Sequence, residues 1–435
     1  EMSTFAIDDG FVEAMVRGFR SGFLADENYN AIKTCNNLQE LKIVSPISLV
    51  FHSSLLKASS ATTAAALNIS SICSLFLSSH PLFEADSKFL LGLEETDYAP
   101  YLVTEGSNLP VTQLRARLKR KLADEFAYLQ AQAVYPLSEF LRLMLCRFMI
   151  DNVVNIIEGL KNGVNPEDLI ANADPLGYFP EIKNMKIVDA DDFTGLYSTV
   201  LIDTPVGPYF SKFLEENIGE GSESKTLQEI HNIFKELKPE QIRTSLKKMW
   251  LESFYYFIQK ECNSTTKEVM GDLLMHEADY KTIQVIYNSI GNKDLTSMVS
   301  RTTTRKRLCP SLGYLYPDCE RELVNVTTLD NLKAAVVGIS TYSELLKEAP
   351  DPIKKEEYNP NAKSLDDLMY EEEVKKYSLA FEGQNHYAVF YTYLKLKEQE
   401  IRNITWYAEL VARKLPKNHP GWKKIIVPFR WEAGK

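Results

Sequence analysis

One stretch of the chain comes close to a nucleotide-binding loop. Residues 219–226 read GEGSESKT, which differs by one residue from the phosphate-binding pattern GxxxxGK followed by Ser or Thr. The mismatch is Ser224, where a glycine would let the backbone approach a phosphate. Glu220 and Glu223 would repel phosphate, and the preceding segment predicts a helix where the motif needs a strand. We therefore predict a flexible loop here and no bound nucleotide.

Two other groupings contain residue types that bind metal ions or transfer protons. Glu382 and His386 are four residues apart, the spacing of two ligands on one face of a helix. The sequence offers no second Glu and His pair to complete such a site, and His276 with Glu277 is equally isolated. The six cysteines form neither a CxxC pair nor a zinc-finger spacing, so reduced thiols are expected. The sequence therefore predicts no catalytic residue, no cofactor-binding residue and no metal site.

The composition is that of a soluble globular protein with an acidic balance. Hydrophobic residues make up 45% and charged residues 25%, and 49 basic against 59 acidic residues give a formal net charge of -10. This excess of negative charge argues against a general nucleic-acid-binding surface. The first residues lack a basic region followed by an apolar core, so no secretory signal is expected.

Residues 44–89 differ from the rest of the chain. They are rich in Ser, Ala, Thr and Leu, and they carry no charge between Ala58 and Pro81. The length alone would suggest a membrane span. However, many hydroxyl side chains dilute the apolar character, and no basic flank sets an orientation. We interpret the segment as peripheral, weakly tethered and of low complexity.

The longest uninterrupted helical pattern covers residues 384–415. No Gly or Pro lies between Gly383 and Pro416, so the pattern predicts one helix of about 30 residues. Its apolar residues recur at the spacing of one helical face. A dense polar cluster interrupts that face at residues 397–403. This helix is the element around which we expect the chain to be organised.

The polar cluster has two interpretations, a solvated helix face or a desolvated network. Glu398 and Arg402 have the spacing of an intrahelical pair, which on an exposed helix is worth only about 0.2–0.5 kcal/mol. Breaking a desolvated network would cost about 1–3 kcal/mol or more. Our hypothesis is the network, with Glu398, Glu400, Arg402, Asn403 and Trp406 as its candidate residues. It predicts that Arg402→Ala clearly destabilises the protein or its assembly with partner proteins.

Other segments complete the predicted helical chain. Two short helices are expected in residues 9–42, and longer ones at 114–134, 137–157 and 242–258. Arg301, Arg305, Lys306 and Arg307 form a basic cluster that we place on a Thr-rich loop, either solvated or facing an acidic partner. The tail at 416–435 is expected to lie on the surface or against a neighbouring protein, so its removal should leave the chain folded.

Several of these segments together resemble one known family. Residues 395–406 read KLKEQEIRNITW and are similar to the C-terminal signature of subunit d of the eukaryotic V-type proton ATPase. Residues 9–18 (DGFVEAMVRG), 147–154 (RFMIDNVV) and 386–391 (HYAVFY) fit the same family, which has a related counterpart in the archaeal and bacterial V/A-type enzymes. The family usually has two arginines after Asp279, where this chain has Tyr280 and Lys281. The low-complexity stretch, about residues 44–92, looks like an insertion into the family pattern.

The resemblance implies a fold and a function. It implies an all-α, funnel-like assembly of three similar helical units, here residues 1–160, 161–295 and 296–435. It implies a non-catalytic pump subunit without cofactors, which links stalk subunits D and F to the proteolipid c-ring, adjoins subunit a and transmits torque. Such a subunit lies peripherally on the cytosolic face of vacuolar, endosomal or lysosomal membranes and binds no nucleic acid. The alternative is a free helical adaptor that binds protein partners.

Overall fold

The computed structural model describes residues 9–35, 96–102, 110–187, 204–218, 238–292, 298–317, 320–353 and 363–430. The low-complexity stretch and the segment resembling a phosphate loop lie outside these ranges. The chain divides into two compact units. Unit 1 contains Glu1–Ser21, Lys119–Glu400 and Pro428–Lys435, and unit 2 contains Gly22–Leu118 and Ile401–Val427. This division differs from the three consecutive units predicted from the sequence, and the threefold repeat stays a prediction.

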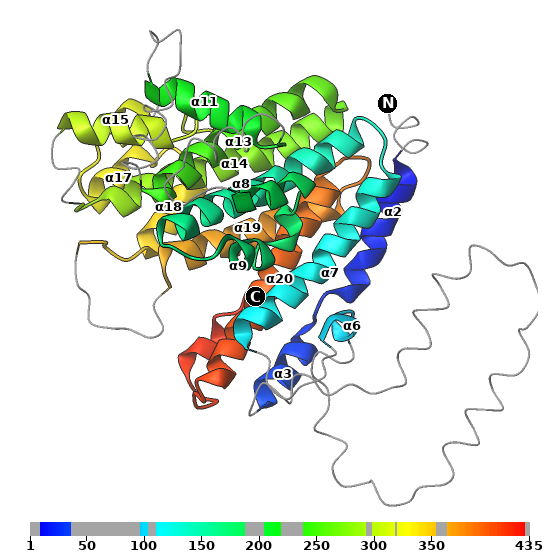
Figure 1. The fold of residues 1–435 in the computed structure, drawn as a ribbon. Helices are drawn as coiled ribbons and strands as arrows, with labels where there is room; N and C mark the ends of the chain where they lie inside the picture. Colours follow the sequence, from blue (N-terminus) through cyan, green and yellow to red (C-terminus); the bar gives the residue numbers. More distant parts are fainter. Residues whose placement is uncertain are drawn as a thin grey trace, which may run out of the picture. The chain divides into compact units, whose positions relative to one another are not determined.

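Every regular element in the described ranges is helical, which confirms the predicted all-α class (Figure 1). The first half contains α2 (Gly10–Phe19), η1 (Arg20–Gly22), α3 (Asp26–Thr34), α6 (Ala99–Leu102), α7 (Val111–Gln132), α8 (Leu137–Lys161), α9 (Pro166–Ala171), η3 (Pro175–Gly177), η4 (Pro180–Ile187) and α11 (Gly207–Ile218). The second half contains α13 (Pro239–Glu261), α14 (Ser264–Ser289), α15 (Met298–Leu308), α16 (Glu320–Leu323), α17 (Leu329–Ala335), α18 (Ser340–Glu348), α19 (Leu365–Glu382), α20 (Ala388–Ala412) and η6 (Pro420–Lys423).

Three long helices, α8, α13 and α14, form the middle of unit 1, and Figure 1 shows them side by side. Buried residues occupy all sides of α8, as expected of a helix enclosed by neighbours. The Phe140 and Phe254 rings join α8 to α13, with centroids 5.2 Å apart. Trp250 of α13 donates from Nε1 to the carbonyl oxygen of Leu143 over 2.7 Å, so this buried indole keeps a hydrogen bond.

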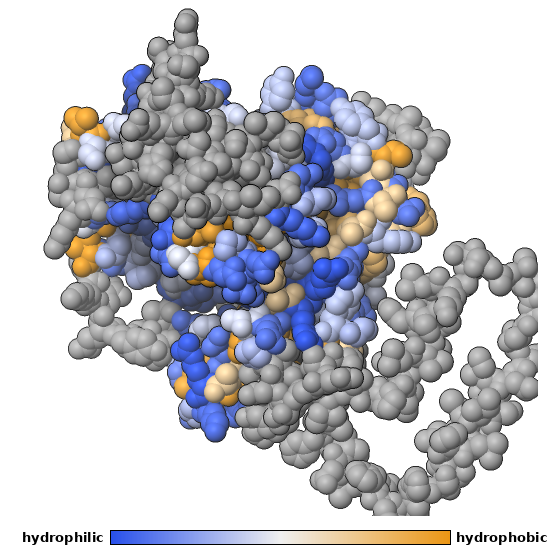
Figure 2. All heavy atoms as spheres, viewed as in Figure 1, coloured by the Kyte–Doolittle hydropathy of each residue, from blue (hydrophilic) through white to orange (hydrophobic). Residues whose placement is uncertain are grey.

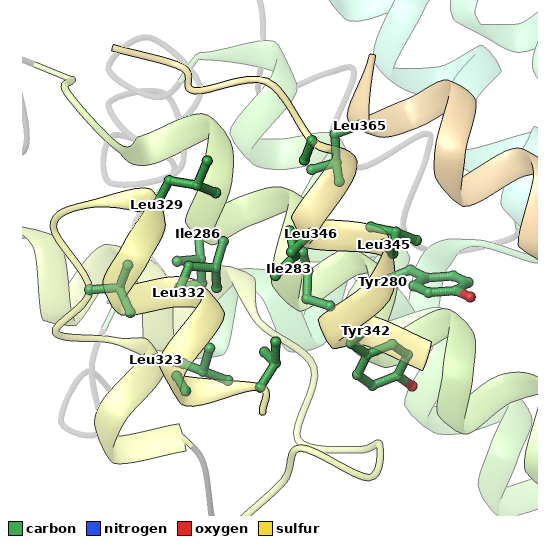
Figure 3. Close-up of a cluster of buried hydrophobic side chains, with 14 of the residues drawn as sticks. Tyr280, Ile283, Ile286, Leu323, Leu329, Leu332, Tyr342, Leu345, Leu346 and Leu365 are labelled. Atoms are coloured by element: carbon green, nitrogen blue, oxygen red, sulfur yellow. The ribbon is translucent and has the colours of Figure 1, made fainter. Parts of the chain in front are cut away.

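A second apolar core in unit 1 surrounds the C-terminal half of α14 (Figure 3). Ile283 and Ile286 of α14 pack against Leu332 of α17 and Leu346 of α18, and all four side chains are fully buried. Helices α17 and α18 are short, so each depends on this shared burial rather than on its own propensity. Helix α19 begins with a capping box, in which Ser364 and Asp367 satisfy each other's backbone N–H groups.

Unit 2 is held together by aromatic and aliphatic side chains from distant parts of the chain. Tyr29 of α3 and Tyr407 of α20 meet edge to face, with ring centroids 6.1 Å apart. Trp422 of η6 lies against Tyr407, with ring centroids 5.0 Å apart, and is 3% exposed. The predicted surface position is therefore wrong for Gly421 and Trp422, which are buried, while residues 416–418 and 423–424 are exposed.

The basic cluster at residues 301–307 also departs from the prediction. It lies on α15 rather than on a loop, and Arg305 is 1% exposed. Its guanidinium donates to Ser289 Oγ over 2.9 Å and to the carbonyl oxygens of Val324 and Val326 over 3.0 and 2.6 Å. These carbonyl groups follow α16, so Arg305 binds the chain where that helix ends. Tertiary contacts thus override the low helix propensity of the neighbouring threonines.

The outer face is largely hydrophilic where the described residues are visible, with separate hydrophobic patches between the polar areas (Figure 2). Large exposed apolar side chains include Phe11, Tyr256 and Leu379, each more than 60% exposed. Within the described ranges, no helix combines the length and the apolar character that crossing a membrane requires.

Candidate functional site: a buried charge network

Helix α20 is enclosed on all sides over its first seven residues, 388–394. Partly buried or exposed positions follow later, at Lys395, Glu398, Arg402, Thr405, Trp406 and Glu409. Their three- and four-residue spacing places them on one side of the helix. Polar residues elsewhere on α20 lie inside the protein and need partners there.

Glu398 pairs with a cation on another helix rather than with Arg402. Arg147 of α8 places Nη2 3.2 Å from Glu398 Oε2, and the two side chains are 17% and 19% exposed. The guanidinium also lies over the Phe148 ring, 4.9 Å from its centroid. Burial alone would lower the pKa of Arg147, but the Glu398 and Glu277 carboxylates outweigh it and raise that pKa.

A second ion pair lies beside the first and joins α14 to α20. Lys395 Nζ is 3.1 and 3.0 Å from the two carboxylate oxygens of Glu277, and the hydroxyl of Tyr391 donates to the same carboxylate. Burial raises the pKa of Glu277, but the charges of Lys395 and Arg147 outweigh burial and lower that pKa to about 2. The positive charges of Arg147 and Lys395 equal in number the negative charges of Glu398 and Glu277. These two pairs together therefore carry no net charge.

A third group of charges fastens α8 to α13. Asp151 accepts from Arg243 Nη1 over 3.1 Å and from Lys247 Nζ over 2.8 Å. Arg243 Nη2 also donates to Asn155 Oδ1 over 3.0 Å. Burial opposes ionisation of Asp151, but the two cations prevail and lower its pKa. We use the name central charge network for Arg147, Asp151, Arg243, Lys247, Glu277, Lys395 and Glu398.

Glu400 belongs to a separate pair within α20. Lys397 Nζ lies 2.7 Å from Glu400 Oε1, and the two side chains are 1% and 0% exposed. In α7, Lys121 pairs with Glu125, whose carboxylate also accepts from the Tyr393 hydroxyl over 2.7 Å. The buried intrahelical pair of α20 is therefore Lys397 with Glu400, not the predicted Glu398 with Arg402.

Asn403 and Trp406 bind the C-terminal segment within unit 2. Asn403 donates to the carbonyl oxygen of Ile426 over 2.7 Å and accepts from its N–H over 3.2 Å. Its amide also donates to the Tyr29 hydroxyl over 3.2 Å. Trp406 is 41% exposed and donates from Nε1 to the carbonyl oxygen of Gly421 over 2.8 Å. These two residues hold the tail against α20.

Arg402 corrects the network hypothesis, because the structure places its side chain in the exposed class. An exposed side chain is not part of a desolvated cluster, whereas Glu400 and Asn403 are buried. The predicted single network is in fact three arrangements. Glu398 belongs to the central charge network, and Glu400 forms an ion pair with Lys397. Asn403 forms hydrogen bonds with the tail.

Glu382 and His386, the pair with the spacing of two metal ligands on a helix, do not lie on the same helix. Glu382 ends α19 and pairs with Arg20 over 2.6 Å, while His386 lies before α20 begins. Among the described residues, no group of three side chains of the metal-binding types lies close enough together to hold an ion.

The sequence does not show which residues of the central charge network pair with each other. Arg147 and Asp151 interrupt an apolar run in 143–157, which signals buried charges in need of counterions. Glu277 carries no such signal, and only the packing of α14 against its neighbours brings it to Lys395.

The family model described as the ATP synthase (C/AC39) subunit matches residues 85–421. The chain belongs to this family. All the candidate residues on α20 and the whole central charge network fall within the match to the C/AC39 family.

Individual relatives extend the match to nearly the full length. The chain is 33% identical over 413 residues to a probable V-type proton ATPase subunit d from Oryza sativa, with 95% of each chain covered. It is 32% identical over 412 residues to subunit d of Dictyostelium discoideum, covering 95% of this chain and 93% of the relative. It is 27% identical over 410 residues to subunit d of Saccharomyces cerevisiae, covering 94% of this chain and 95% of the relative. These matches confirm the resemblance noted in the sequence.

Proposed function

We propose that this chain is the non-catalytic subunit d of a V-type proton ATPase, the rotary pump that drives protons across membranes with ATP. The observation that carries the proposal is the relation to subunits d over 95% of both chains. A helical adaptor that only shared a repeat pattern would match in parts. The relation instead runs from end to end, which favours the pump subunit over the free adaptor.

The central charge network supports a mechanical role. Its charges join α8, α13, α14 and α20 to one another rather than facing outward to a substrate. Ion pairs and hydrogen bonds between helices restrain the helices that they join. A part that transmits torque must resist deformation, and a stiff helical body with paired charges meets that requirement.

The partners in this proposal are the central stalk subunits D and F, the proteolipid c-ring and subunit a. The chain would lie peripherally at the cytosolic face of an acidic organelle, such as a vacuole, endosome or lysosome. The resemblance of the 395–406 signature and the full-length relation to subunits d support this assignment.

Co-purification tests the assignment. The full-length chain is tagged in its own cells, the membranes are washed with salt and gently solubilised, and the bound proteins are identified by mass spectrometry. We expect stalk, ring and head subunits of the proton pump in comparable amounts. Recovery of the chain in the soluble fraction, with partners unrelated to the pump, would support the free adaptor instead.

A further inference from the structure

Unit 1 contains a chain of titratable side chains outside the central charge network. Lys376 Nζ of α19 lies 2.9 Å from His276 Nε2 of α14, and His276 Nδ1 lies 2.7 Å from the Tyr342 hydroxyl of α18. Tyr342 in turn donates to Asp279 Oδ2 over 2.7 Å. Three consecutive hydrogen bonds therefore join α14 to both α18 and α19.

Donor and acceptor chemistry fixes the direction of each bond. A lysine ammonium has only donors, so His276 Nε2 must be the acceptor of the bond from Lys376. The single hydroxyl proton of Tyr342 goes to the Asp279 carboxylate, so His276 Nδ1 must carry the hydrogen of the other bond. The arrangement thus requires a neutral His276 with its hydrogen on Nδ1.

Asp279 anchors the far end of this chain. Its carboxylate is buried and also accepts from the backbone N–H groups of Tyr314 and Leu315, over 2.9 and 3.1 Å. Burial raises the pKa of Asp279 to about 6, while its hydrogen bonds oppose that shift. Above that pH the carboxylate is ionised and holds the Tyr342 proton.

A second acceptor lies beside His276 on the same helix. Asp272 Oδ1 is 3.5 Å from His276 Nε2 and accepts from the Tyr314 hydroxyl over 2.5 Å. A proton added to Nε2 would turn that nitrogen into a donor. It could no longer accept from Lys376, and the two cations would repel each other, whereas Asp272 would accept from it.

We propose that His276 is a proton-controlled latch, which ties α19 to α14 through Lys376 when neutral and transfers to Asp272 when protonated. The titratable groups that face the ring are Asp272 and Tyr280 of α14, Tyr342 of α18, Lys376 of α19 and Tyr314 of the segment before α16. All the contacts lie within this chain, so the latch does not rest on the proposed function.

The charges around His276 set the sign of each effect. Burial and then the Lys376 ammonium lower the pKa of His276, and Asp272 raises it. Removing the Lys376 charge must therefore raise this pKa, and removing the Asp272 charge must lower it. Both side chains are on the rim of the cluster, so neither substitution empties the core.

Histidine-selective 15N NMR of the full-length chain tests the latch. Near neutral pH we expect the ring-nitrogen shifts of a neutral His276 with hydrogen on Nδ1, assigned with His276→Gln. Lys376→Met should raise the pKa of His276 and Asp272→Asn should lower it, each by at least about 0.5 pH unit. Lys375→Met is the matched control, because its ammonium pairs with Glu372 over 2.7 Å on the exposed side of α19.

A Nε2–H tautomer at neutral pH, or a pKa that neither variant moves, would overturn the proposal. Hydrogen exchange provides the second readout, for the release of α19. Between about pH 8 and about pH 5, after correction for intrinsic rates, amides around Lys376 should lose protection in the wild type. In Lys376→Met they should already be less protected and lose little more. Equal pH dependence in both proteins would also contradict the latch.

Discussion

Two arginines on neighbouring elements differ in what surrounds them. Arg147 is 17% exposed and pairs with Glu398, whereas Arg402 is at an exposed position of α20. Replacing Arg147 with Ala leaves a partly buried carboxylate without its cation, which costs more than the loss of a surface pair (about 1 kcal/mol) and at most as much as that of a fully buried one (about 3–5 kcal/mol). Arg402→Ala removes a side chain at an exposed position and should cost clearly less than Arg147→Ala. Urea unfolding of both variants measures the difference, and equal losses would contradict the assignment of the network.

Glu277 gives the central charge network a defined pH dependence. Its pKa in the folded protein is about 2, below the ordinary value of 4.5. Its carboxylate therefore contributes stability above pH 4.5, and this contribution is lost as the pH falls towards 2. We expect Glu277→Gln to be less stable than the wild type near neutral pH, and the gap between them to narrow in acid. Denaturation at several pH values measures the gap, with Glu268→Gln, at an exposed position of the same helix, as the control for removing a surface carboxylate.

Gly313 is a residue whose importance only the structure reveals. Its φ is +120°, and an added Cβ would lie 2.1 Å from Asp279 Oδ1. A side chain here would strain the backbone and displace the carboxylate that anchors Tyr314 and Leu315. We expect Gly313→Ala to destabilise the protein by more than about 1 kcal/mol. Gly338→Ala is the matched control, because an added Cβ there meets nothing within 4 Å. Similar thermal stability of the two variants would show that the loop adapts.

At the scale of elements, the tail and α20 stabilise each other within unit 2. Trp422 is 3% exposed and donates to the carbonyl oxygen of Pro416 over 3.0 Å. Trp422→Ala should therefore cost about 3–5 kcal/mol, as for other buried aromatic side chains. Trp406→Ala, at a residue 41% exposed, should cost clearly less. Chemical denaturation separates the two outcomes, and a harmless Trp422→Ala would restore the prediction of a dispensable tail.

The helices could be predicted from sequence better than their ends. Apolar periodicity located α7, α8, α13 and α20, but α20 spans Ala388–Ala412 rather than the predicted residues 384–415. Asn385 and Lys414 have φ values of 62° and 53°, so left-handed residues flank the helix. Beyond its end, Leu415 N–H bonds to the Leu410 carbonyl oxygen and Lys414 N–H to that of Val411, as in a Schellman motif. Lys414 occupies the left-handed position that glycine usually takes after a helix, so the sequence did not indicate that the helix ends here.

Burial around α20 was the part that sequence reasoning missed. The pattern suggested one apolar face, yet Thr392, Lys397 and Glu400 are as buried as the apolar residues. A single sequence shows which residues are polar but not which helices will enclose them. Of the candidate residues on α20, Glu400 and Asn403 are buried and Arg402 is exposed, and the partners Arg147 and Tyr29 came only from the fold.

At the scale of the molecule, family and function rest on different grounds. Membership of the C/AC39 family follows from a match to residues 85–421. The proposed pump role rests on two further observations. The chain is related to subunits d over 95% of both lengths, and ion pairs join its helices to one another. The insertion at about residues 44–92 stays a prediction and lies outside the described residues.

The most direct test of the central claim is ATP-driven acidification. Membrane vesicles are prepared from cells that lack this chain and from the same cells expressing the wild type, Arg402→Ala or Arg147→Ala, and proton uptake is followed with a pH-sensitive dye. We predict that loss of the chain abolishes ATP-dependent uptake, that the wild type and Arg402→Ala restore it, and that Arg147→Ala restores less. Undiminished ATP-driven uptake in vesicles without the chain would contradict its assignment to the proton pump.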